Sequence, residues 1–397
     1  MGKRACIVRQ AHYPEDMLVR REAEALKATG FDVDVIGVAF PQCPREEIID
    51  GIHVYRLPPQ RKKRGVARYL FEYFMFSFLV TLKLAVLHLQ RPYALIQVNT
   101  MPDFLVFATL IPRLLGARVT LQVYEPMPEL WMTRFHFLPL IKLLEVIQQL
   151  SLRYAHAAFA VTQQLKDSFV GRGADPDKIT VVLNVPEPRF FQVHDAEPVP
   201  LPDGHFTLIC HGAIEERYGH DNMLEAIHSL KSAIPNIRLR ILGNGSYLQE
   251  LLTQVEALAL QDHVQYLGYV PWPQLVDELR RADVGIVAQK SSPYSNLVHT
   301  GKMYDYLYFS KPVIASRLRA VKAYFGEESL CYFAPGDSED LARAIRYLYE
   351  HPEAREMFVR KSRDLYERYR WEQQRLMYTF VSRKSAGLDT LGATSAG

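Results

Sequence analysis

The chain has 397 residues, which is enough for two or three domains that each bury a sizeable core. A peptide hormone, a disulfide-stapled miniprotein and a single small binding module are therefore excluded. Apolar residues make up 48% and charged residues 23%, as in ordinary globular proteins, and the formal net charge of +3 gives no reason to expect nucleic acid as a partner.

The first part of the chain alternates short apolar runs with amphipathic stretches. Residues 5–8 and 31–38 predict strands, and residues 17–29 between them predict a helix that stops at Gly30. The pattern recurs as a strand at 95–98, a helix at 104–115 and a strand at 118–123. Strands that alternate with helices predict a parallel sheet covered by helices on both faces.

A polar, proline-rich stretch at 187–204 is the best candidate for a linker. The alternation restarts after it, with strands expected at 207–210, 238–242, 264–267, 284–287 and 313–315 and helices at 221–233, 275–281 and 302–309. The fold class is therefore α/β, with two doubly wound domains of Rossmann type. The last residues, 385–397, are rich in Gly, Ala, Ser and Thr and are expected to form a disordered tail.

One segment departs from the soluble pattern. The basic run from Arg61 to Arg64 precedes an apolar stretch at 66–89, whose uncharged centre at 73–82 is shorter than the roughly 20 residues of a transmembrane helix. Two interpretations stay open. The stretch is either a helix buried against the first sheet, or a helix that lies on a membrane while the basic run contacts anionic lipid.

The cysteines indicate a reducing compartment and give no sign of a metal site. They stand singly, without a CxxC pair or the spacing of a zinc site, and the first residues do not read as a secretion signal, so we expect a cytoplasmic location. Asp32 and Asp34 form a DxD pattern, but alternation within a strand places both carboxylates on one face. We interpret them as the polar face of a strand and expect no metal.

The loop at 211–221 has the composition of a phosphate-binding turn. Gly212 and Gly219 would let the backbone approach a ligand, and Asp221 is a plausible N-cap for the helix that follows. The free N–H groups of that helix start favour an anion, and Arg217 adds a bidentate phosphate donor.

Two further features follow later strands of the same sheet: a glycine turn, and a charged pair on a predicted helix. Gly243 and Gly245 flank a short turn after the strand at 238–242, although the turn is too short for a full dinucleotide fingerprint. Lys302 and Asp305 are three residues apart and share a helix face. A cation and a carboxylate in one crevice suit a phosphate and a pair of ribose hydroxyls.

The order and spacing of several blocks give the chain a family resemblance. It is similar to the family 4 retaining glycosyltransferases of the GT-B fold, over nearly its whole length, through the blocks REAEALKATGFDVDVI, PDKITVVLNVPEPRFF, HGAIEERYGHDNMLEAI, RLRILGNGSYLQEL, ADVGIVAQ and GKMYDYLYFSKPVIAS. The resemblance implies an acceptor domain at 1–190, a nucleotide-sugar donor domain at 204–369, and a last helix at 370–384 that crosses back to the first domain. It also implies no metal and no cofactor, the nucleotide sugar being the donor substrate.

The family's pattern of donor-binding residues is only partly present in this sequence. Asp305 stands where the family has the second glutamate of its EX7E pair, which holds the donor ribose, and Arg217 resembles the basic residue over the diphosphate. The first glutamate falls at Leu297, which cannot hydrogen-bond a sugar. Asn296 or His299 would substitute for it, or a backbone group would make the contact.

The acceptor side departs further from the family pattern. The His-Asp pair that the family often shows after a strand of the first domain reads Tyr124-Glu125 here. Glu125 or Glu129 is expected to face the acceptor, and His12, in the loop after the first strand, is a further candidate.

These observations predict a metal-independent retaining transferase that moves a sugar from a nucleotide-diphosphate donor, expected to be a UDP-sugar. Its expected acceptor is a lipid-linked saccharide in surface-glycan biosynthesis, at the inner face of the plasma membrane. Arg217, Lys302 and Glu125 are the predicted catalytic residues. Two alternatives stay open: a nucleotide-sugar epimerase of the same fold, and a non-catalytic glycosyltransferase-like partner subunit.

Overall fold

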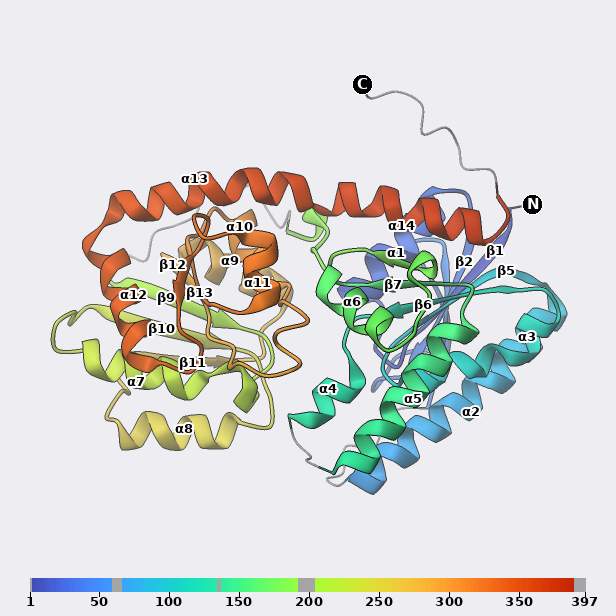
Figure 1. Cartoon of the computed structure of the whole chain (residues 1–397), viewed down its shortest axis with the longest axis horizontal. Helices are drawn as coiled ribbons and strands as arrows, with labels where there is room; N and C mark the ends of the chain where they lie inside the picture. The colour runs from blue at the N-terminus through green and yellow to red at the C-terminus, as the bar shows by residue number, and fades with distance from the viewer. Residues whose placement is uncertain (1, 59–65, 134–136, 192–203, 389–397) are drawn as a thin grey trace. The chain divides into compact units, whose positions relative to one another are not determined.

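The computed structural model describes residues 2–58, 66–133, 137–191 and 204–388 (Figure 1). The chain divides into two compact units. Unit 1 comprises Met1–Asn184 and Glu372–Gly397, and unit 2 comprises Val185–Trp371. Each unit has one mainly parallel sheet covered by helices, as expected for two doubly wound α/β domains.

Unit 1 contains an eight-stranded sheet in the order β3-β4-β2-β1-β5-β6-β7-β8. Its described strand pairs are parallel except for β3 and β4, which form an antiparallel edge hairpin that the sequence patterns did not predict. The interior strands are buried on both faces, as helix-covered parallel sheets require. The strands are β1 (Arg4–Val8), β2 (Asp32–Val38), β3 (Glu46–Ile49), β4 (Ile52–Leu57), β5 (Tyr93–Asn99), β6 (Arg118–Val123), β7 (Ala157–Ala160) and β8 (Ile179–Val181).

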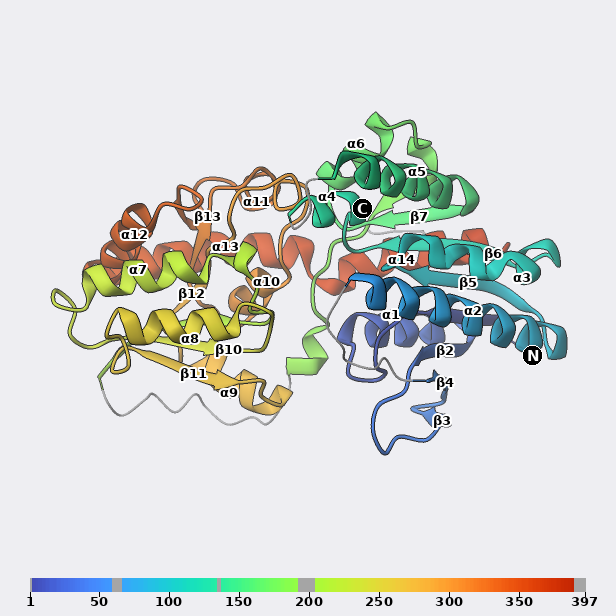
Figure 2. The same cartoon turned by 90° about the horizontal axis from the view of Figure 1, so that it is seen from below.

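The helices of unit 1 follow the expected alternation (Figure 2). The carboxylate of Asp16 caps the first of them, because it accepts hydrogen bonds of 3.1 Å from the backbone N–H groups of Leu18 and Val19. The helices are α1 (Met17–Ala28), α2 (Val66–Gln90), the 3-10 helix η1 (Asp103–Thr109), α3 (Leu110–Leu114), α4 (Met127–Met132), α5 (Leu138–Tyr154), α6 (Gln163–Gly171) and the 3-10 turn η2 (Pro176–Lys178).

The helix expected at 104–115 is not one regular α-helix. The chain forms η1 and then only one short α-helix, α3. Pro112 lies inside α3, and a proline lacks the N–H that would bond the carbonyl four residues earlier. The preceding residues therefore adopt the tighter 3-10 form.

Unit 2 contains a six-stranded parallel sheet in the order β11-β10-β9-β12-β13-β14, the strand order 3-2-1-4-5-6 of a Rossmann domain. Its strands are β9 (Phe206–His211), β10 (Ile237–Leu242), β11 (Val264–Gly268), β12 (Val284–Val287), β13 (Val313–Ser316) and β14 (Cys331–Phe333). Its helices are the 3-10 turns η3 (Pro188–Phe191) and η4 (Glu216–Tyr218), and α7 (His220–Leu230), α8 (Leu248–Ala257), α9 (Trp272–Arg281), α10 (Lys302–Tyr308), α11 (Arg319–Phe325), α12 (Ser338–Glu350) and α13 (Pro352–Tyr369).

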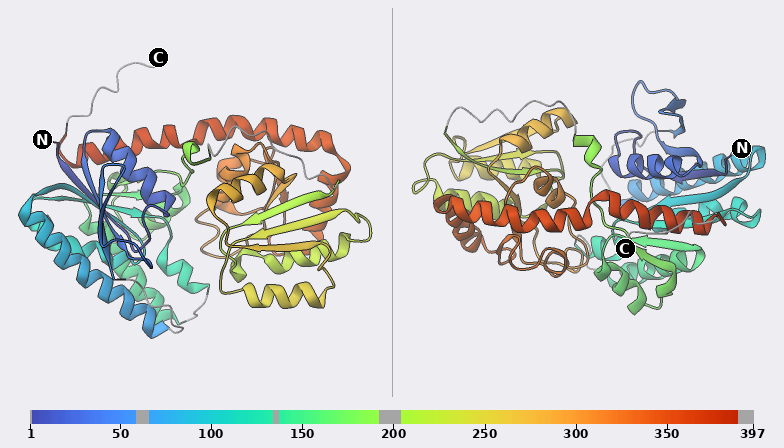
Figure 3. Two further views of the ribbon diagram at one scale, coloured as in Figure 1. Left: turned by 180° about the vertical axis from the view of Figure 1, so that it is seen from behind. Right: turned by 90° about the horizontal axis from the view of Figure 1, so that it is seen from above.

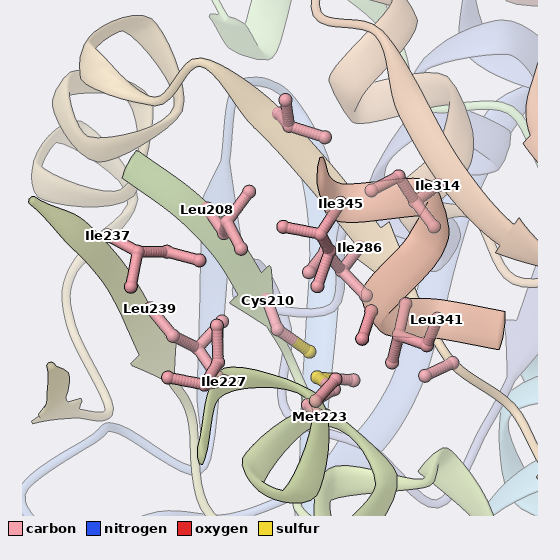
Figure 4. Close-up of a cluster of buried hydrophobic side chains, with 14 of the residues drawn as sticks. Leu208, Cys210, Met223, Ile227, Ile237, Leu239, Ile286, Ile314, Leu341 and Ile345 are labelled. Atoms are coloured by element: carbon pink, nitrogen blue, oxygen red, sulfur yellow. The ribbon is translucent and has the colours of Figure 1, made fainter. Parts of the chain in front are cut away.

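The core of unit 2 lies between the sheet and the pair α7 and α12, which pack against each other. Leu208 and Cys210 of β9 and Leu239 of β10 point toward Ile227 of α7 and Ile345 of α12 (Figure 4). These side chains are almost completely buried. This core fixes the strand ends from which the site loops of unit 2 emerge.

The boundary between the units lies earlier than the proline-rich stretch suggests. Residues from Val185 onward already belong to unit 2. Phe191, which is 1% exposed, stacks on the rings of Trp272 and Tyr308, with centroids 5.2 and 4.4 Å apart. The first part of the expected linker is thus packed on unit 2, whereas 192–203 lie outside the described residues.

The last helix, α14 (Trp371–Ser385), returns to unit 1, where it lies along the opposite side of the sheet from α2 (Figure 3). Tyr378 is fully buried there and donates a 2.9 Å hydrogen bond to Gln97 Oε1 on β5. Residues 386–388, which were expected to belong to a disordered tail, instead bond back to the last turn of α14. The rest of the predicted tail, 389–397, lies outside the described residues.

The carboxylates of the DxD pattern form ion pairs within unit 1. Asp34 is 2% exposed and pairs with Arg4, while Asp32 pairs with Arg91 at 2.5 Å. In the described part of the chain, no group of three His, Cys, Asp or Glu side chains could hold a metal ion. The strand is buried on both faces, so Asp34 does not lie on the solvent-facing strand surface that the alternation suggested.

The apolar stretch at 66–89 forms a longer helix than its uncharged centre suggested. The window Phe71–Gln90 of α2 has 20 residues with a mean hydropathy of 1.4, so by length and composition it could cross a membrane. The sequence-based expectation that this segment is too short was therefore wrong, although one such helix is weak evidence of a span. The basic run from Arg61 to Arg64 lies outside the described residues.

The bond between Tyr378 and Gln97 provides a test of how α14 is held. In the variant Tyr378→Phe, the buried amide oxygen of Gln97 loses its donor, which costs about 1–2 kcal/mol. Amide hydrogens of α14 and β5 in the full chain should then exchange about 5–30-fold faster. Tyr347→Phe, at a 42% exposed side chain of unit 2, is the control and should leave these rates unchanged. Equal rates in Tyr378→Phe and the wild type would contradict this account.

Candidate functional site

The candidate donor site lies at the carboxyl edge of the sheet in unit 2. The chain leaves β9 toward β10 on one side and reaches β12 on the other, so the strand order reverses between β9 and β12. Ligands of doubly wound sheets bind at this switch point. The predicted donor residues belong to loops that follow β9, β10 and β12, or to α10 directly after the last of these loops.

Backbone hydrogen bonds join these loops into one structure. The N–H of Gly212 donates to the carbonyl of Leu242 at 2.8 Å, and that of Ile214 donates to Asn244 at 3.0 Å. The N–H of Gly243 continues the series with a 2.7 Å bond to Gly268. The loops after β9, β10 and β11 therefore form a continuous floor at the sheet edge.

The glycines in this floor are required by close packing between backbones. A Cβ at Gly243, where φ is +132°, would lie 1.8 Å from the carbonyl oxygen of Gly212, and one at Gly245 would lie 2.0 Å from that of Ile214. Gly219, with φ +64°, would meet the carbonyl oxygen of Ala288 at 2.0 Å. The sequence predicted these glycines for approach to a ligand, and the structure adds this packing reason.

Two predicted cations meet at the ring of Tyr218. Lys302 Nζ lies 4.4 Å and Arg217 Cζ lies 4.8 Å from the ring centroid. Burial lowers the pKa of Lys302; Asp305 opposes this shift and Arg217 adds to it. Arg217 also pairs with Glu215 at 3.7 Å. The two cations repel each other, so an anion between them would be favourable.

Asp305 faces His211 at the end of β9. It lies in the first turn of α10, is 8% exposed, and its Oδ2 lies 3.3 Å from His211 Nε2. Burial raises the pKa of Asp305 to about 7, against the effect of Lys302. Burial, aided by Lys302, lowers the pKa of His211 to about 3. His211 is thus neutral near pH 7, where Asp305 titrates.

The two substitutes expected for the missing first glutamate hold other parts of the fold. Asn296 Oδ1 accepts a 3.0 Å bond from the N–H of Arg319 at the start of α11, and its Nδ2 donates to Ser292. His299 is 6% exposed and bonds Tyr304 through Nε2 at 2.8 Å. The side chain of Asn296 thus stabilises its own loop, and that of His299 is part of an aromatic cluster.

Asp221 does not cap the helix that follows the first loop. The N-cap of α7 is Gly219, in the left-handed conformation, and no side chain caps this helix start. Asp221 instead pairs with Lys290 at 2.6 Å. Within the described residues, no side chain at the N-cap therefore competes with an anion for the backbone N–H groups at the start of α7.

The predicted acceptor residues lie in unit 1, in loops after β1 and β6. His12 is exposed, and its Nδ1 lies 3.1 Å from the carbonyl oxygen of Val38. Glu125 follows β6 and is half-buried. These two positions share the carboxyl edge of a parallel sheet and remain candidates for acceptor contact.

Tyr124 and Glu129 are engaged in structural contacts. Tyr124 is 5% exposed, and its hydroxyl donates to the buried carboxylate of Glu22. Glu129 is 2% exposed and pairs with Arg172 at 2.5 Å. Neither side chain presents its polar group on the surface, so their predicted contact with an acceptor gains no support from the geometry.

Sequence reasoning assigned no role to His211 or Tyr218. The Nε2 atom of His211 lies 3.3 Å from Asp305 Oδ2, and Tyr218 is the ring that both cations share. The position of His211 at the end of a predicted strand was a usable signal. The role of Tyr218 depends on the tertiary placement of Lys302 and gave no local signal.

Comparison with known families agrees with this architecture. Residues 17–184 match the family described as "Glycosyl transferase 4-like domain", and residues 194–365 match "Glycosyl transferases group 1". The chain belongs to the GT4-like glycosyltransferases of the GT-B fold. It is accordingly a glycosyltransferase enzyme.

Solved structures with this fold include several transferases. Sucrose-phosphate synthase from Thermosynechococcus elongatus has a TM-score of 0.77 at 16% identity, over 96% of this chain and 98% of that one. The Anabaena protein HepE in complex with UDP and glucose has a TM-score of 0.74 at 15% identity, over 97% of this chain and 100% of that one. At such identities the likeness shows the fold.

Two curated proteins have related sequences over shorter stretches. A sulfoquinovosyl transferase of Arabidopsis thaliana is 25% identical over 162 residues, which are 39% of this chain and 29% of that protein. A GDP-mannose-dependent phosphatidylinositol monomannoside mannosyltransferase of Mycolicibacterium smegmatis is 28% identical over 78 residues, 20% of each chain. The chain thus matches less than a third of either protein's length.

The backbone packing at Gly243 predicts the effect of adding one methyl group. Gly243→Ala should lower the melting temperature of the full chain by several degrees, because the Cβ clashes with a backbone oxygen at a cost of about 2 kcal/mol or more. Gly336→Ala is the matched control, since Gly336 also has a positive φ, +83°, but open space around its Cβ. Equal shifts for the two variants would mean that backbone strain alone explains the glycine.

The titration of Asp305 predicts a pH-dependent stability difference. Because burial raises the folded pKa of Asp305 from 3.8 to about 7, the carboxyl group destabilises the fold by an amount that is absent below about pH 3.8, grows as pH rises from about 4 to about 7, and is constant at higher pH. Asp305→Asn should therefore raise the melting temperature clearly at pH 8 and have a much smaller effect at pH 4. Asp277→Asn, at a 57% exposed side chain, is the control. A pH-independent effect of Asp305→Asn would contradict the raised pKa.

Proposed function

We propose that this enzyme transfers a sugar from a UDP-sugar to a lipid-linked saccharide, with retention of the anomeric configuration. The observation that carries the donor half is the convergence of Arg217, Lys302 and Asp305 at the switch point of the unit 2 sheet. Structural neighbours bound to UDP, UDP-glucose and UDP-2-fluoro glucose support a uridine donor.

In the proposed reaction, the bond between the anomeric carbon and the diphosphate oxygen breaks first. Arg217, Lys302 and the uncapped start of α7 stabilise the negative charge that develops on the departing diphosphate. The acceptor hydroxyl then bonds to the anomeric carbon on the same face, and its proton passes to the leaving phosphate. This route needs no protein nucleophile and no metal ion.

Asp305 has the proposed role of holding the donor ribose. As an ionised carboxylate it accepts hydrogen bonds from two hydroxyls, and its shorter reach than glutamate brings the ribose nearer to the end of β9. His211 is neutral near pH 7 and lies beside it, so its imidazole can share this contact. Glu125 and His12 are the proposed acceptor-side residues, with Glu125 orienting the attacking hydroxyl.

The proposed acceptor is a lipid-linked saccharide of surface-glycan assembly, which would place the reaction at the cytoplasmic face of a membrane. The mannosyltransferase relative is named for a phosphatidylinositol-linked acceptor, which supports this choice for the present chain. The four cysteines, Cys6, Cys43, Cys210 and Cys331, are free thiols in the structure, which is consistent with a reducing compartment.

The donor site predicts how two substitutions affect nucleotide binding. In calorimetry, UDP should bind the wild type more tightly than GDP or ADP. Arg217→Ala and Lys302→Ala should each weaken UDP binding by about 10–100-fold, since a charge-assisted bond is worth about 1.5–3 kcal/mol. Arg343→Ala, at a 67% exposed side chain of unit 2, is the control and should bind as the wild type does. Unchanged affinity in both site variants would place the nucleotide elsewhere.

The transfer itself is tested with UDP-sugars and a membrane lipid extract as acceptor. We expect a glycolipid product whose new linkage keeps the anomeric configuration of the donor, and activity that persists in EDTA. Inversion, or loss of activity on chelation, would refute the proposed mechanism. Conversion of the donor sugar in the absence of acceptor would favour an epimerase instead.

A further inference from the structure

Unit 1 exposes large apolar side chains over one group of neighbouring helices. Among the described residues, most of the large hydrophobic side chains that are strongly exposed belong to α2, η1, α3 and α5 or to the residues directly flanking them. We call this surface the apolar helix face. Its most exposed members include Phe74 and Phe78 at 60%, Leu114 at 74% and Leu138 at 69%.

The apolar helix face is continuous across these elements. The helix α2 packs against η1 and α3, and α5 packs against η1 from the other side. Phe74 of α2 stacks on Phe104 of η1 at 5.1 Å, and Phe107 of η1 contacts the ring of Tyr154 of α5, also at 5.1 Å. Figure 2 shows α2, α3 and α5 as neighbours on the side of unit 1 that faces the viewer.

The exposed stripe of α2 is separate from the side that packs on the unit. Phe76, Val80, Leu84 and Leu87 are at most 5% exposed and anchor the helix. The exposed residues at 71, 74, 78, 82, 86 and 89 recur every three or four positions and are all apolar. An ordinary surface helix has polar residues on this outer stripe. The outer stripe therefore needs a partner that removes it from water.

The charged groups of the face favour an anionic partner. Lys142 and Arg153 of α5 are exposed, and they flank the apolar stripe that contains Leu143, Val146 and Leu150. The described acidic side chains of α2, η1, α3 and α5 are either paired with an arginine or buried. Glu72 pairs with Arg68, Glu145 pairs with Arg172, and Asp103 is 1% exposed.

We propose that the apolar helix face docks unit 1 onto the surface of an anionic lipid bilayer, with the outer stripes of α2, α3 and α5 in the acyl region and Lys142 and Arg153 at the headgroups. The helix α2 lies in the membrane plane and does not span the bilayer, because its inner side stays packed on unit 1. A second copy of this chain is a poorer partner, since a symmetric interface would bring these cations toward each other. This proposal rests on the proposed function, because docking would bring unit 1, which carries the predicted acceptor residues, to the bilayer that holds lipid-linked substrates.

The docking is tested by vesicle flotation with the full chain. We expect flotation with vesicles of equal parts phosphatidylglycerol and phosphatidylcholine, and much less with phosphatidylcholine alone. The double variant Phe78→Glu with Leu143→Glu puts one carboxylate on each of two helices and should reduce the floated fraction at least tenfold. Lys142→Gln with Arg153→Gln should reduce flotation severalfold and weaken its salt dependence.

Matched controls separate docking from folding and from self-association. Leu376→Glu on α14 and Ile48→Glu on β3 change side chains that are 64% and 61% exposed outside the face, and should float as the wild type does. Melting temperatures show which variants are folded. Equal losses in controls and face variants, or wild-type flotation of the folded double variant, would overturn the proposal. So would a dimer that fails to float and becomes monomeric in the double variant.

This experiment can fail independently of the proposed reaction. Flotation is measured without nucleotide or acceptor, whereas UDP affinity is measured without vesicles. A chain that binds UDP but does not float would refute the docking and leave the donor chemistry intact. A chain that floats but binds no UDP would do the reverse.

Discussion

The backbone contact between the loops after β9 and β10 is the constraint on which the candidate donor site depends. A Cβ at Gly243 would overlap the carbonyl oxygen of Gly212, and backbone hydrogen bonds extend this contact through Ile214 and Gly268. The floor fixes the end of β9, where His211 meets Asp305, and the loop that presents Arg217. Packed backbone thus helps to position the charged groups of the candidate donor site.

Much of this arrangement follows from the sequence because it depends on local patterns. Alternating strands and helices predicted the α/β class. The segments that follow the strands predicted Gly212, Arg217 and Lys302 as residues of the donor site. Tertiary packing decided the rest. Asn296 has the right chemistry for a sugar, but its side chain is used at the start of α11, and the carboxylate of Glu129 is used by Arg172. The boundary between the units differs from the predicted one because Phe191 stacks on Trp272 and Tyr308, which are distant in sequence.

The apolar stretch at 66–89 is a second case in which tertiary packing could not be predicted from the sequence. Composition alone left a buried helix and a membrane-lying helix as alternatives, and in the structure only one side of α2 is buried. The inner side of α2 anchors it in unit 1, while the outer stripe stays exposed. Continuity of that stripe with α3 and α5 could not be read from spacing, since these helices become neighbours only in the folded chain, where α2 packs on η1 and α3, and α5 packs on η1.

The two proposed anion contacts differ in the kind of electrostatics they use. In unit 2, burial lowers the pKa of Lys302 and raises that of Asp305, so charge is held at defined positions at a cost in stability. Such a site selects a ligand by geometry and is weakly screened by salt. On unit 1, Lys142 and Arg153 are exposed beside apolar side chains, where attraction is long-ranged, screened by salt and tolerant of headgroup position. Fixed charge suits a nucleotide that must be held in register for bond breaking, whereas diffuse charge suits a bilayer on which the enzyme must move to find its acceptor.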